Sequence, residues 1–413
     1  MTVPEAVTAC RVCAAPIAPF MTFGRMPLAN GFLIEADIPS EYFFELAPAF
    51  CPACGMFQLM EQPAPARMFH GRYAFASSSS VRMQHHFKAF AQSVVRRALA
   101  GRRDPLVVEI GSNDGIMLGH LKDAGYRYLG IEPSTNVADL ARARGIETVD
   151  AFFDAALAGR LRSQHGHAHA IIAANVMCHI PDIHAVAAGV AHWLAPDGVF
   201  IFEDPYLGDM IAKTSYDQIY DEHVFMFSAT AVAAAFAPHG LALVDVMPQA
   251  THGGSMRYVL AHRGVAPESP SVAELIAREQ QQGLGQPATY DQFRRNCEAS
   301  RAALKALLGS LRARGARVAG YAATSKSTTV TNYCGIGPDE LEFIADTTPL
   351  KHGTLSPGRH IPVTPREDFV RRPPDYALLF GWNHAAEIFA NEAGFRASGG
   401  KWVTYVPRVE VID

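Results

Sequence analysis

The sequence lacks several features that would each place it in a particular class of protein. Its 413 residues hold 36 lysines and arginines against 40 aspartates and glutamates, which gives a net charge of −4. Nucleic-acid binders usually carry a basic excess or patch, so this balance argues against a nucleic-acid partner. Charged residues make up only 18% of the chain, and no run of like charge is long enough to attract an anionic membrane.

The chain also lacks a long apolar run. Its most apolar stretches are short and interrupted by His, Pro or Asp, as in HAIIAANVMCHIPD, whereas a membrane-spanning helix needs roughly 20 apolar residues. The opening MTVPEAVTACRVC has neither the basic start nor the apolar core of a signal peptide. We therefore expect a cytoplasmic protein without a membrane partner, as a monomer or a small homo-oligomer.

The seven cysteines do not form the framework of a disulfide-rich secreted protein. Four of them occur as two CxxC pairs, Cys10 with Cys13 and Cys51 with Cys54. Two such pairs can surround one tetrahedral Zn²⁺ with thiolates and leave no open position for water or substrate, so they predict a structural zinc site. A redox role is the alternative, but redox CxxC motifs occur singly at a helix start.

The pattern of elements divides the chain into three predicted domains. Residues 1–70 hold both cysteine pairs and form the expected zinc-binding domain. In residues 71–283, short apolar strands alternate with helices, which is typical of a parallel α/β sheet, and a strand over 255–263 would finish it. Residues 284–413 open with a helical pattern that ends at Gly315 and continue as a second, smaller α/β unit. The predicted fold class is α/β, with two Rossmann-like domains after the zinc-binding one.

A glycine-rich turn follows the first strand of the central zone. It reads EIGSNDG, and its glycines would let a ligand approach the backbone closely. A dinucleotide fold favours G-x-G-x-x-G, whereas this E-x-G-x-x-x-G spacing is that of S-adenosylmethionine sites; a turn with incidental glycines is the alternative. The next strand ends in a carboxylate that suits ribose hydroxyls, and a phenylalanine after the third could cover the adenine. The predicted cofactor-binding residues are Gly111, Ser112, Asn113, Gly115, Glu132, Pro133, Phe152, Phe153 and Asn175.

A polar cluster, YDEH, follows the fifth strand of the same zone. It holds Tyr220, Glu222 and His223, and His179 follows the fourth strand in NVMCHIP. Ligands of open α/β sheets bind beyond the carboxyl ends of the strands, which would place these side chains beside a transferable methyl group. An imidazole with a tyrosine donor is what proton abstraction beside a carbonyl requires. The alternatives are an exposed polar turn and, for His179, a core histidine.

The third zone holds a possible anion site in GYAATSKSTT. A strand, a loop of small residues and a helix start can present free backbone N–H groups. Lys326 and the neighbouring hydroxyls of Ser325, Ser327 and Thr328 could then hold a phosphate or diphosphate. A capped helix with a solvated lysine is the alternative interpretation.

The motifs in order resemble one known family. The chain reads CxxC…CxxC, EIGSNDG, NVMCHIPD, YDEHVFMFS, HGGSMR, GYAATSK and PLKHGTLSPGRHIPV. It resembles the three-domain, zinc-containing sugar C-methyltransferases of bacterial deoxysugar pathways over nearly its whole length. The resemblance implies S-adenosylmethionine as methyl donor and C-3 of a nucleotide-linked 4-keto-6-deoxysugar, with a dTDP carrier expected, as acceptor.

The resemblance also implies roles for single residues. His223 would remove the C-3 proton, Tyr220 and Glu222 would position the sugar or stabilise the enolate, and His179 and Tyr73 would face the substrate. Sugar O- or N-methylation, an RNA methyltransferase with a zinc module, and a non-catalytic binding protein are the competing interpretations.

Overall fold

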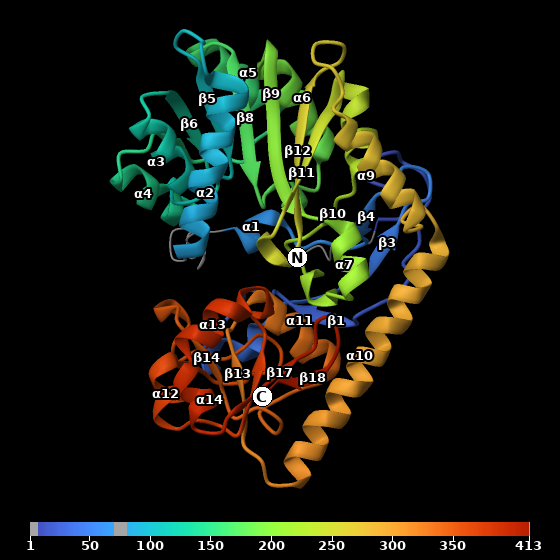
Figure 1. Ribbon diagram of the computed structural model, residues 1–413, viewed down its shortest axis with the longest axis vertical. Coiled ribbons are helices and arrows are strands. Elements are labelled where there is room, and N and C mark those ends of the chain that lie inside the picture. Colours follow the sequence, from blue (N-terminus) through green and yellow to red (C-terminus); the bar gives the residue numbers. More distant parts are fainter. Residues whose placement is uncertain (1–6, 70–80, 413) are drawn as a thin grey trace.

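Three structural regions follow one another along the chain (Figure 1). The computed structural model describes residues 7–69 and 81–412. A small N-terminal region of short strands, drawn in blue, lies between a green and yellow α/β unit and an orange and red one. The long helix α10 (Pro287–Ala313) runs along the side of the molecule and leads from the first unit to the second. The predicted fold class, a zinc-binding region followed by two Rossmann-like units, is confirmed.

The N-terminal region forms two small antiparallel sheets. In the first, β1 (Arg25–Pro27) pairs with β2 (Phe43–Glu45), and in the second, β3 (Pro48–Phe50) pairs with β4 (Phe57–Leu59). The second sheet gains its third strand from the central region, because β10 (Phe225–Met226) pairs antiparallel with β4. The chain directly after the YDEH cluster is thereby fixed to the N-terminal region.

The central unit is a seven-stranded sheet in the order β11-β12-β9-β8-β5-β6-β7. Its strands are β5 (Leu106–Ile110), β6 (Arg127–Ile131), β7 (Thr148–Val149), β8 (Ala168–Ala174), β9 (Leu194–Pro205), β11 (Leu241–Gln249) and β12 (Ser255–His262). The five from β7 to β9 in this order run parallel, whereas β12 and β11 are antiparallel to their neighbours. The carboxyl ends of the parallel strands therefore meet at one edge, where ligands of such sheets bind.

Helices cover both faces of the central sheet, which explains why β5 is apolar along almost its whole length. Val107 packs with residues of α2 and α3, and Val108 points to the other face, toward α5 and α6. The covering helices are α2 (Val81–Val94), α3 (Ile116–Asp123), α4 (Thr135–Ala143), α5 (Ala155–His165), α6 (Ile183–Trp193), α8 (Ala229–Phe236) and α9 (Pro270–Gln281).

The far edge of this sheet differs from the sequence-based expectation. The strand expected over 255–263 is present as β12, but it lies inside the sheet between β9 and β11. The edge strand is β11, which the sequence pattern had not singled out. The two strands form an antiparallel hairpin across the loop 250–254, so one short connection adds two strands at once.

The C-terminal unit is a six-stranded sheet in the order β15-β14-β13-β16-β17-β18, parallel except for β18. Its strands are β13 (Val318–Tyr321), β14 (Ile344–Asp346), β15 (Val363–Pro365), β16 (Tyr376–Leu379), β17 (Lys401–Thr404) and β18 (Glu410–Ile412). Its helices are α11 (Ser325–Cys334), α12 (Arg366–Arg371), α13 (Ala385–Asn391) and α14 (Ala393–Ala397). Helix α11 begins directly after β13, at the carboxyl edge of this sheet.

The two α/β units are separated by a short turn between long helices. Helix α9 packs on β11 of the central sheet, and α10 begins at Pro287 after the turn 282–286. The predicted boundary at 283/284 falls inside this turn, and the boundary at 70/71 lies outside the described residues; both stay predictions. Within residues 7–69 and 81–412, no helix combines the length and apolar character that crossing a membrane requires.

Candidate active site

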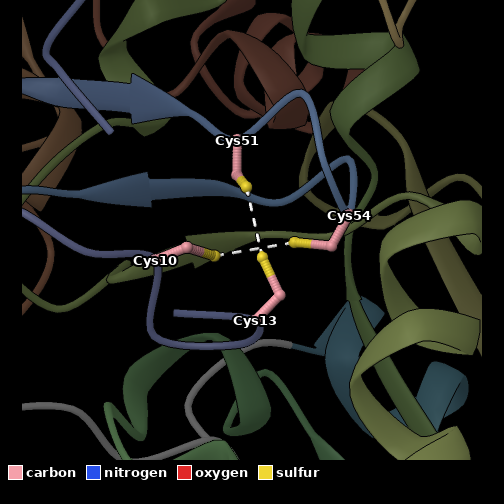
Figure 2. Close-up of side chains that lie close together, drawn as sticks. All are labelled: Cys10, Cys13, Cys51 and Cys54. Carbon is pink, nitrogen blue, oxygen red and sulfur yellow. Dashed lines mark hydrogen bonds between the residues drawn. The ribbon is translucent and has the colours of Figure 1, made fainter. Parts of the chain in front are cut away.

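The four predicted zinc ligands converge on one point (Figure 2). Their sulfur atoms all lie within 4.8 Å of one another, with 3.5 Å between Cys10 Sγ and Cys54 Sγ and 3.5 Å between Cys13 Sγ and Cys51 Sγ. Sulfurs bound at about 2.3 Å to a tetrahedral Zn²⁺ lie roughly 3.8 Å apart, so this set fits the ion. Four thiolate ligands fill the coordination sphere, and the site is therefore closed to substrate.

The first cysteine of this cluster is prepared for a metal by neighbouring donors. Cys10 Sγ accepts hydrogen bonds from Gln58 Nε2 at 3.0 Å and from Val12 N at 3.4 Å. The pKa of Cys10 is lowered to about 4, first by the thiol of Cys54, with backbone N–H groups and Gln58 acting in the same direction. A lowered pKa favours the thiolate form that binds metal. Gln58, on β4, was not indicated by the sequence, because it lies 48 positions from the cysteine that it contacts.

The turn after β5 requires both of its predicted glycines. Gly111 has a φ of +66°, and a Cβ there would lie 2.3 Å from Val176 Cγ2. Gly115 has a φ of +76°, and its Cβ would lie 2.9 Å from Ile146 Cγ1. Asn113, between them, is also left-handed with a φ of +48°. The resulting tight turn follows β5 directly and so lies at the carboxyl edge of the sheet.

Glu132 follows β6 and faces this turn. Its Oε2 accepts a hydrogen bond from Asn113 N at 3.0 Å, its Oε1 accepts one from Ser134 N at 2.8 Å, and the residue is 6% exposed. Burial raises the pKa of Glu132, and the backbone donors oppose that shift. Each oxygen keeps a further acceptor position, so ribose hydroxyls can still bind. Pro133 adjoins this carboxylate, and the buried Ser112 hydroxyl has no hydrogen-bond partner among the described residues.

The two phenylalanines predicted to bind the cofactor differ in burial. Phe153 is buried and stacks on Trp193 with 6.5 Å between ring centroids, whereas Phe152 is 50% exposed. Of the two, Phe152 is the side chain that is free to cover an adenine. Asn175 follows β8 in the left-handed region, and its buried Oδ1 lacks a hydrogen-bond partner in the described part of the chain. An unpartnered buried acceptor at a strand end fits a donor group of S-adenosylmethionine.

His223 is held in one tautomer by its hydrogen bonds. Its Nδ1 lies 2.8 Å from the carbonyl oxygen of Gln218, which can only accept, so Nδ1 carries the proton. Its Nε2 lies 2.7 Å from the Tyr220 hydroxyl, which therefore donates to the Nε2 lone pair. Burial lowers the pKa of His223 well below its usual range, and the nearby His179 acts in the same direction. The imidazole is thus neutral at neutral pH, with a basic lone pair at Nε2.

His179 lies beside this imidazole rather than in the core of the sheet. Its ring stacks on His223 with 5.3 Å between centroids, and Phe69 stacks on it at 5.5 Å. Burial lowers the pKa of His179 to about 4, so it too is neutral. The backbone carbonyl of His179 accepts a hydrogen bond from Gln62 Nε2 at 3.2 Å. The structure therefore brings the two predicted histidines together and encloses them with N-terminal residues.

The carboxylates of the YDEH segment are buried, which excludes an exposed polar turn. Glu222 is 4% exposed and accepts a hydrogen bond from Asn30 Nδ2 at 2.6 Å. Asp221 is 1% exposed and accepts one from Ala29 N at 2.9 Å. Asn30 lies 192 positions away in the sequence and carries no local motif, so only the fold could identify it.

The Lys326 side chain is buried rather than solvated, and side chains of the fold cap the start of the helix on which it lies. It is 9% exposed, donates to Asn383 Oδ1 at 2.8 Å and lies 4.8 Å from the centre of the Trp382 ring. The helix start behind it forms a capping box in which Thr324 and Ser327 satisfy each other. The hydroxyls expected around an anion are thus partly used by the fold, while the buried ammonium remains a candidate for phosphate.

One predicted residue cannot be placed, and one more lysine joins the site. Tyr73 lies outside the described residues. Lys351, from the PLKHG motif, lies 4.9 Å from the centre of the Phe32 ring, and its pKa is lowered by burial, whereas Asp346 and Glu222 raise it. This lysine therefore shares the electrostatic environment of Glu222. No separate role for Lys351 could be predicted from the sequence, because its neighbours come from distant segments.

Known families match successive parts of the chain. The description "Putative zinc binding domain" matches residues 10–69, "Methyltransferase domain" matches residues 83–246, and "C-methyltransferase C-terminal domain" matches residues 250–407. The chain is also 36% identical to C-methyltransferase NovU of Streptomyces niveus over 407 residues, which cover 98% of this chain and 96% of NovU.

Solved structures show weaker similarity to part of the chain. The PH0226 protein from Pyrococcus horikoshii OT3 is 13% identical, with a TM-score of 0.36, and covers 48% of this chain and 98% of its own. Magnesium protoporphyrin IX methyltransferase from Synechocystis PCC 6803 with bound SAH is 14% identical, with a TM-score of 0.34, and covers 43% of this chain and 83% of its own.

Proposed function

Because this chain belongs to the C-methyltransferase family, we propose that it methylates C-3 of a nucleotide-linked 4-keto-6-deoxysugar, such as a dTDP-sugar. S-Adenosylmethionine, when bound, supplies an electrophilic methyl group. The observation that supports the proposal most directly is the neutral, Nδ1-protonated imidazole of His223, with a basic Nε2 beside the Tyr220 hydroxyl. A carbon acceptor needs such a base, because it becomes nucleophilic only after its proton is removed.

In the proposed reaction, His223 and Tyr220 act in sequence. His223 Nε2 takes the proton from C-3, and the electron pair of the broken C–H bond delocalises onto the C-4 oxygen as an enolate. This transfer requires the Tyr220 hydroxyl to turn first from the single Nε2 lone pair to the C-4 oxygen of the bound sugar. There it donates to the oxygen on which the negative charge develops, and the freed Nε2 lone pair takes up the C-3 proton.

The surrounding residues would bind and orient the sugar nucleotide. His179 forms a neutral wall against His223, and Glu222, held by Asn30, offers an acceptor for a sugar hydroxyl. Lys326 offers a buried ammonium to the phosphates, and Tyr73 is proposed to face the sugar. Gly111, Glu132, Phe152 and Asn175 would hold the methyl donor at the neighbouring strand ends.

The proposal is tested with a panel of synthetic nucleotide 4-keto-6-deoxysugars and a methyl donor labelled with ¹³C. We expect one panel member to gain a ¹³CH₃ group bonded to carbon and to lose its C-3 proton signal in the product NMR spectrum. A product with an O–CH₃ or N–CH₃ resonance would contradict carbon methylation. Turnover of non-nucleotide ketosugars at the same rate would contradict the nucleotide part of the proposal.

A further inference from the structure

Asp217 is a buried carboxylate that connects the central unit to the C-terminal unit. It is 0% exposed, and its Oδ2 accepts hydrogen bonds from Trp382 Nε1 at 2.6 Å and from the Tyr405 hydroxyl at 2.7 Å. The two donors lie 165 and 188 positions further along the chain. A buried carboxylate that loses its donors keeps its desolvation penalty, so this contact favours the docked arrangement of the two units.

The residue after Asp217 contacts the proposed base. The Gln218 carbonyl accepts the hydrogen bond from His223 Nδ1 at 2.8 Å. Asp217 and Gln218 belong to one turn of 3-10 helix, η5 (Tyr216–Gln218), so a rotation at the first alters the direction of the second carbonyl. Tyr216 packs on Tyr405 with 6.2 Å between ring centroids, which also fixes this turn against the C-terminal unit.

Trp382 connects the same carboxylate to the buried lysine. Its ring lies 4.8 Å from Lys326 Nζ, and the next residue, Asn383, accepts the hydrogen bond from that ammonium at 2.8 Å. The ring also lies close against Gly253, where a Cβ would lie 2.1 Å from the indole. Trp382 is thus held between the hairpin loop of the central unit and the candidate phosphate-binding lysine.

We propose that Asp217 is a positioning residue that couples the docking of the C-terminal unit to the tautomer of His223. With Trp382 and Tyr405 bound to it, Asp217 fixes the turn whose Gln218 carbonyl holds the proton on Nδ1. Without both donors, the turn relaxes, and the imidazole can place its proton on Nε2, where it cannot act as a base. This inference rests on the proposed role of His223.

The test uses variants that remove hydrogen-bond donors to Asp217 and leave an aromatic side chain at each position, with Tyr405→Phe as the variant that keeps its ring. Tyr405→Phe and Trp382→Phe each remove one donor to Asp217, and the double variant removes both. Tyr321→Phe is the matched control, because the Tyr321 hydroxyl donates to the buried Glu392 at 2.6 Å but lies within the C-terminal unit. Thermal melting of all variants shows whether each full-length chain folds and how much stability it loses.

The first readout is nitrogen NMR of the full chain with ¹⁵N-labelled histidine, in which the His223 signal is the one that His223→Asn removes. We expect the wild type and Tyr321→Phe to show Nδ1 protonated, and the double variant to show a mixture of tautomers. The second readout is the exchange of the C-3 hydrogen of a nucleotide-linked 4-keto-6-deoxysugar for deuterium in D₂O, with S-adenosylhomocysteine bound to the enzyme. We expect it to slow by about tenfold in the double variant, with cofactor affinity unchanged, since misplacing a catalytic group has effects of this order or larger.

Two outcomes separate this inference from the proposed function. If the folded double variant keeps the wild-type tautomer and exchange rate, the coupling through Asp217 is overturned, and the proposed function stands. If the tautomer responds but His223→Asn still catalyses exchange at the wild-type rate, His223 is not the base, and both the proposed base and the inference fail. Equal slowing in Tyr321→Phe would also overturn the inference, because it would indicate a general loss of stability.

Discussion

Two clusters of titratable side chains in this protein are built in opposite ways. The cysteine cluster, Cys10, Cys13, Cys51 and Cys54, consists of four identical groups that face one point (Figure 2). The histidine cluster, Tyr220, His223 and His179, consists of unlike groups that bond to or stack on one another. Identical ligands around one point bind an ion and exclude other molecules, whereas unlike partners leave one lone pair in a defined direction.

Within the cysteine cluster the pKa shifts differ in sign: the pKa of Cys10 is lowered, whereas burial raises that of Cys51 and the hydrogen bond with Cys10 raises that of Cys54. Cys10 and His179 therefore favour opposite charge states. Around Cys10, hydrogen-bond donors lower the pKa to about 4 and so favour the charged thiolate. Around His179, burial without a charged partner lowers the pKa to about 4 and so favours the neutral imidazole. A thiolate at Cys10 is stabilised by a bound cation, whereas a neutral imidazole keeps a lone pair that can accept a proton.

The largest effect is expected from breaking the cysteine cluster. Cys51→Ser should remove the bound zinc and unfold the N-terminal region, because zinc binding to such sites is worth about 10–16 kcal/mol and is coupled to folding. Elemental analysis and thermal melting measure both changes. Cys297→Ala, at a buried cysteine outside the cluster, should keep one zinc per chain. One equivalent of zinc in Cys51→Ser would contradict the ligand assignment.

The next largest effect is expected from the histidine cluster. His223→Asn nearly keeps the shape of the side chain but cannot take up the proton, so turnover should fall by about 10²–10⁴. Zinc content, melting temperature and cofactor affinity should change little, which distinguishes this cluster from the cysteines. His239→Asn, at a partly buried histidine in another part of the fold, is the control and should remain active. A fully active His223→Asn would assign the base to Tyr220, Glu222 or His179.

The two clusters differ in how far the sequence could predict them. The CxxC spacing sufficed for the cysteines, since each pair is a local motif and the ligand chemistry restricts the arrangement. The YDEH segment indicated side chains that the fold buries close together, and their roles stay predictions; their partners Asn30 and Gln218 act through an amide and a backbone carbonyl. Neither has a sequence signature, because a contact across 192 positions and a carbonyl direction both depend on the complete fold.

The same limit applies to the fold. Alternation of strands and helices predicted both α/β units, because buried parallel strands are apolar along their length. It did not predict that β10 joins the N-terminal sheet, since two residues carry no periodicity. The helix start at Lys326 looked like an open anion site, but the capping box and the burial of the lysine depend on tertiary neighbours.

A smaller effect is expected at Glu132, which lies in neither cluster. Its replacement should change cofactor affinity alone. Glu132→Ala should weaken S-adenosylmethionine binding by about 1.5–3 kcal/mol, the range of a charge-assisted hydrogen bond. Calorimetry measures the affinity, and zinc content should stay at one per chain. Glu132→Gln keeps an acceptor oxygen for only one of the Asn113 and Ser134 N–H groups, whereas the alanine variant keeps none, so the glutamine variant should lose less stability. Unchanged affinity in both variants would contradict the placement of the ribose.

A still smaller effect on cofactor affinity is expected at Phe152, and the neighbouring Phe153 serves as its control. Phe152→Ala should weaken cofactor binding by about 0.5–1.5 kcal/mol, the range of an aromatic contact, and leave the melting temperature nearly unchanged. Phe153→Ala should instead destabilise the fold by about 3–5 kcal/mol, because that ring is packed in the core against Trp193. Calorimetry and melting on both variants test the assignment, and the reverse pattern would contradict it.

The smallest expected effect is the response of turnover to mild acid. His223 acts in its unprotonated form, and burial places its pKa well below 6.5, so the active form should persist as the pH falls from 8 to 6. An imidazole with an ordinary pKa of about 6.5 would be mostly protonated at pH 6, and its rate would fall roughly fourfold. We expect a change in kcat/KM of less than about twofold over this range, given that lowered pKa.

This measurement needs a control for folding. Histidines whose pKa is lowered in the fold take up protons more readily in the unfolded chain, so stability is complete above pH 6.5 and declines as the pH falls toward 4. Zinc content and melting temperature must therefore be recorded at each pH, and rates are compared only where the chain is folded. A fourfold loss of rate centred near pH 6.5 in folded, zinc-loaded protein would show that His223 has the pKa of a water-exposed imidazole. The contrast between the Cys10 thiolate, which its neighbours stabilise, and the histidine cluster, which excludes charge, would then fail.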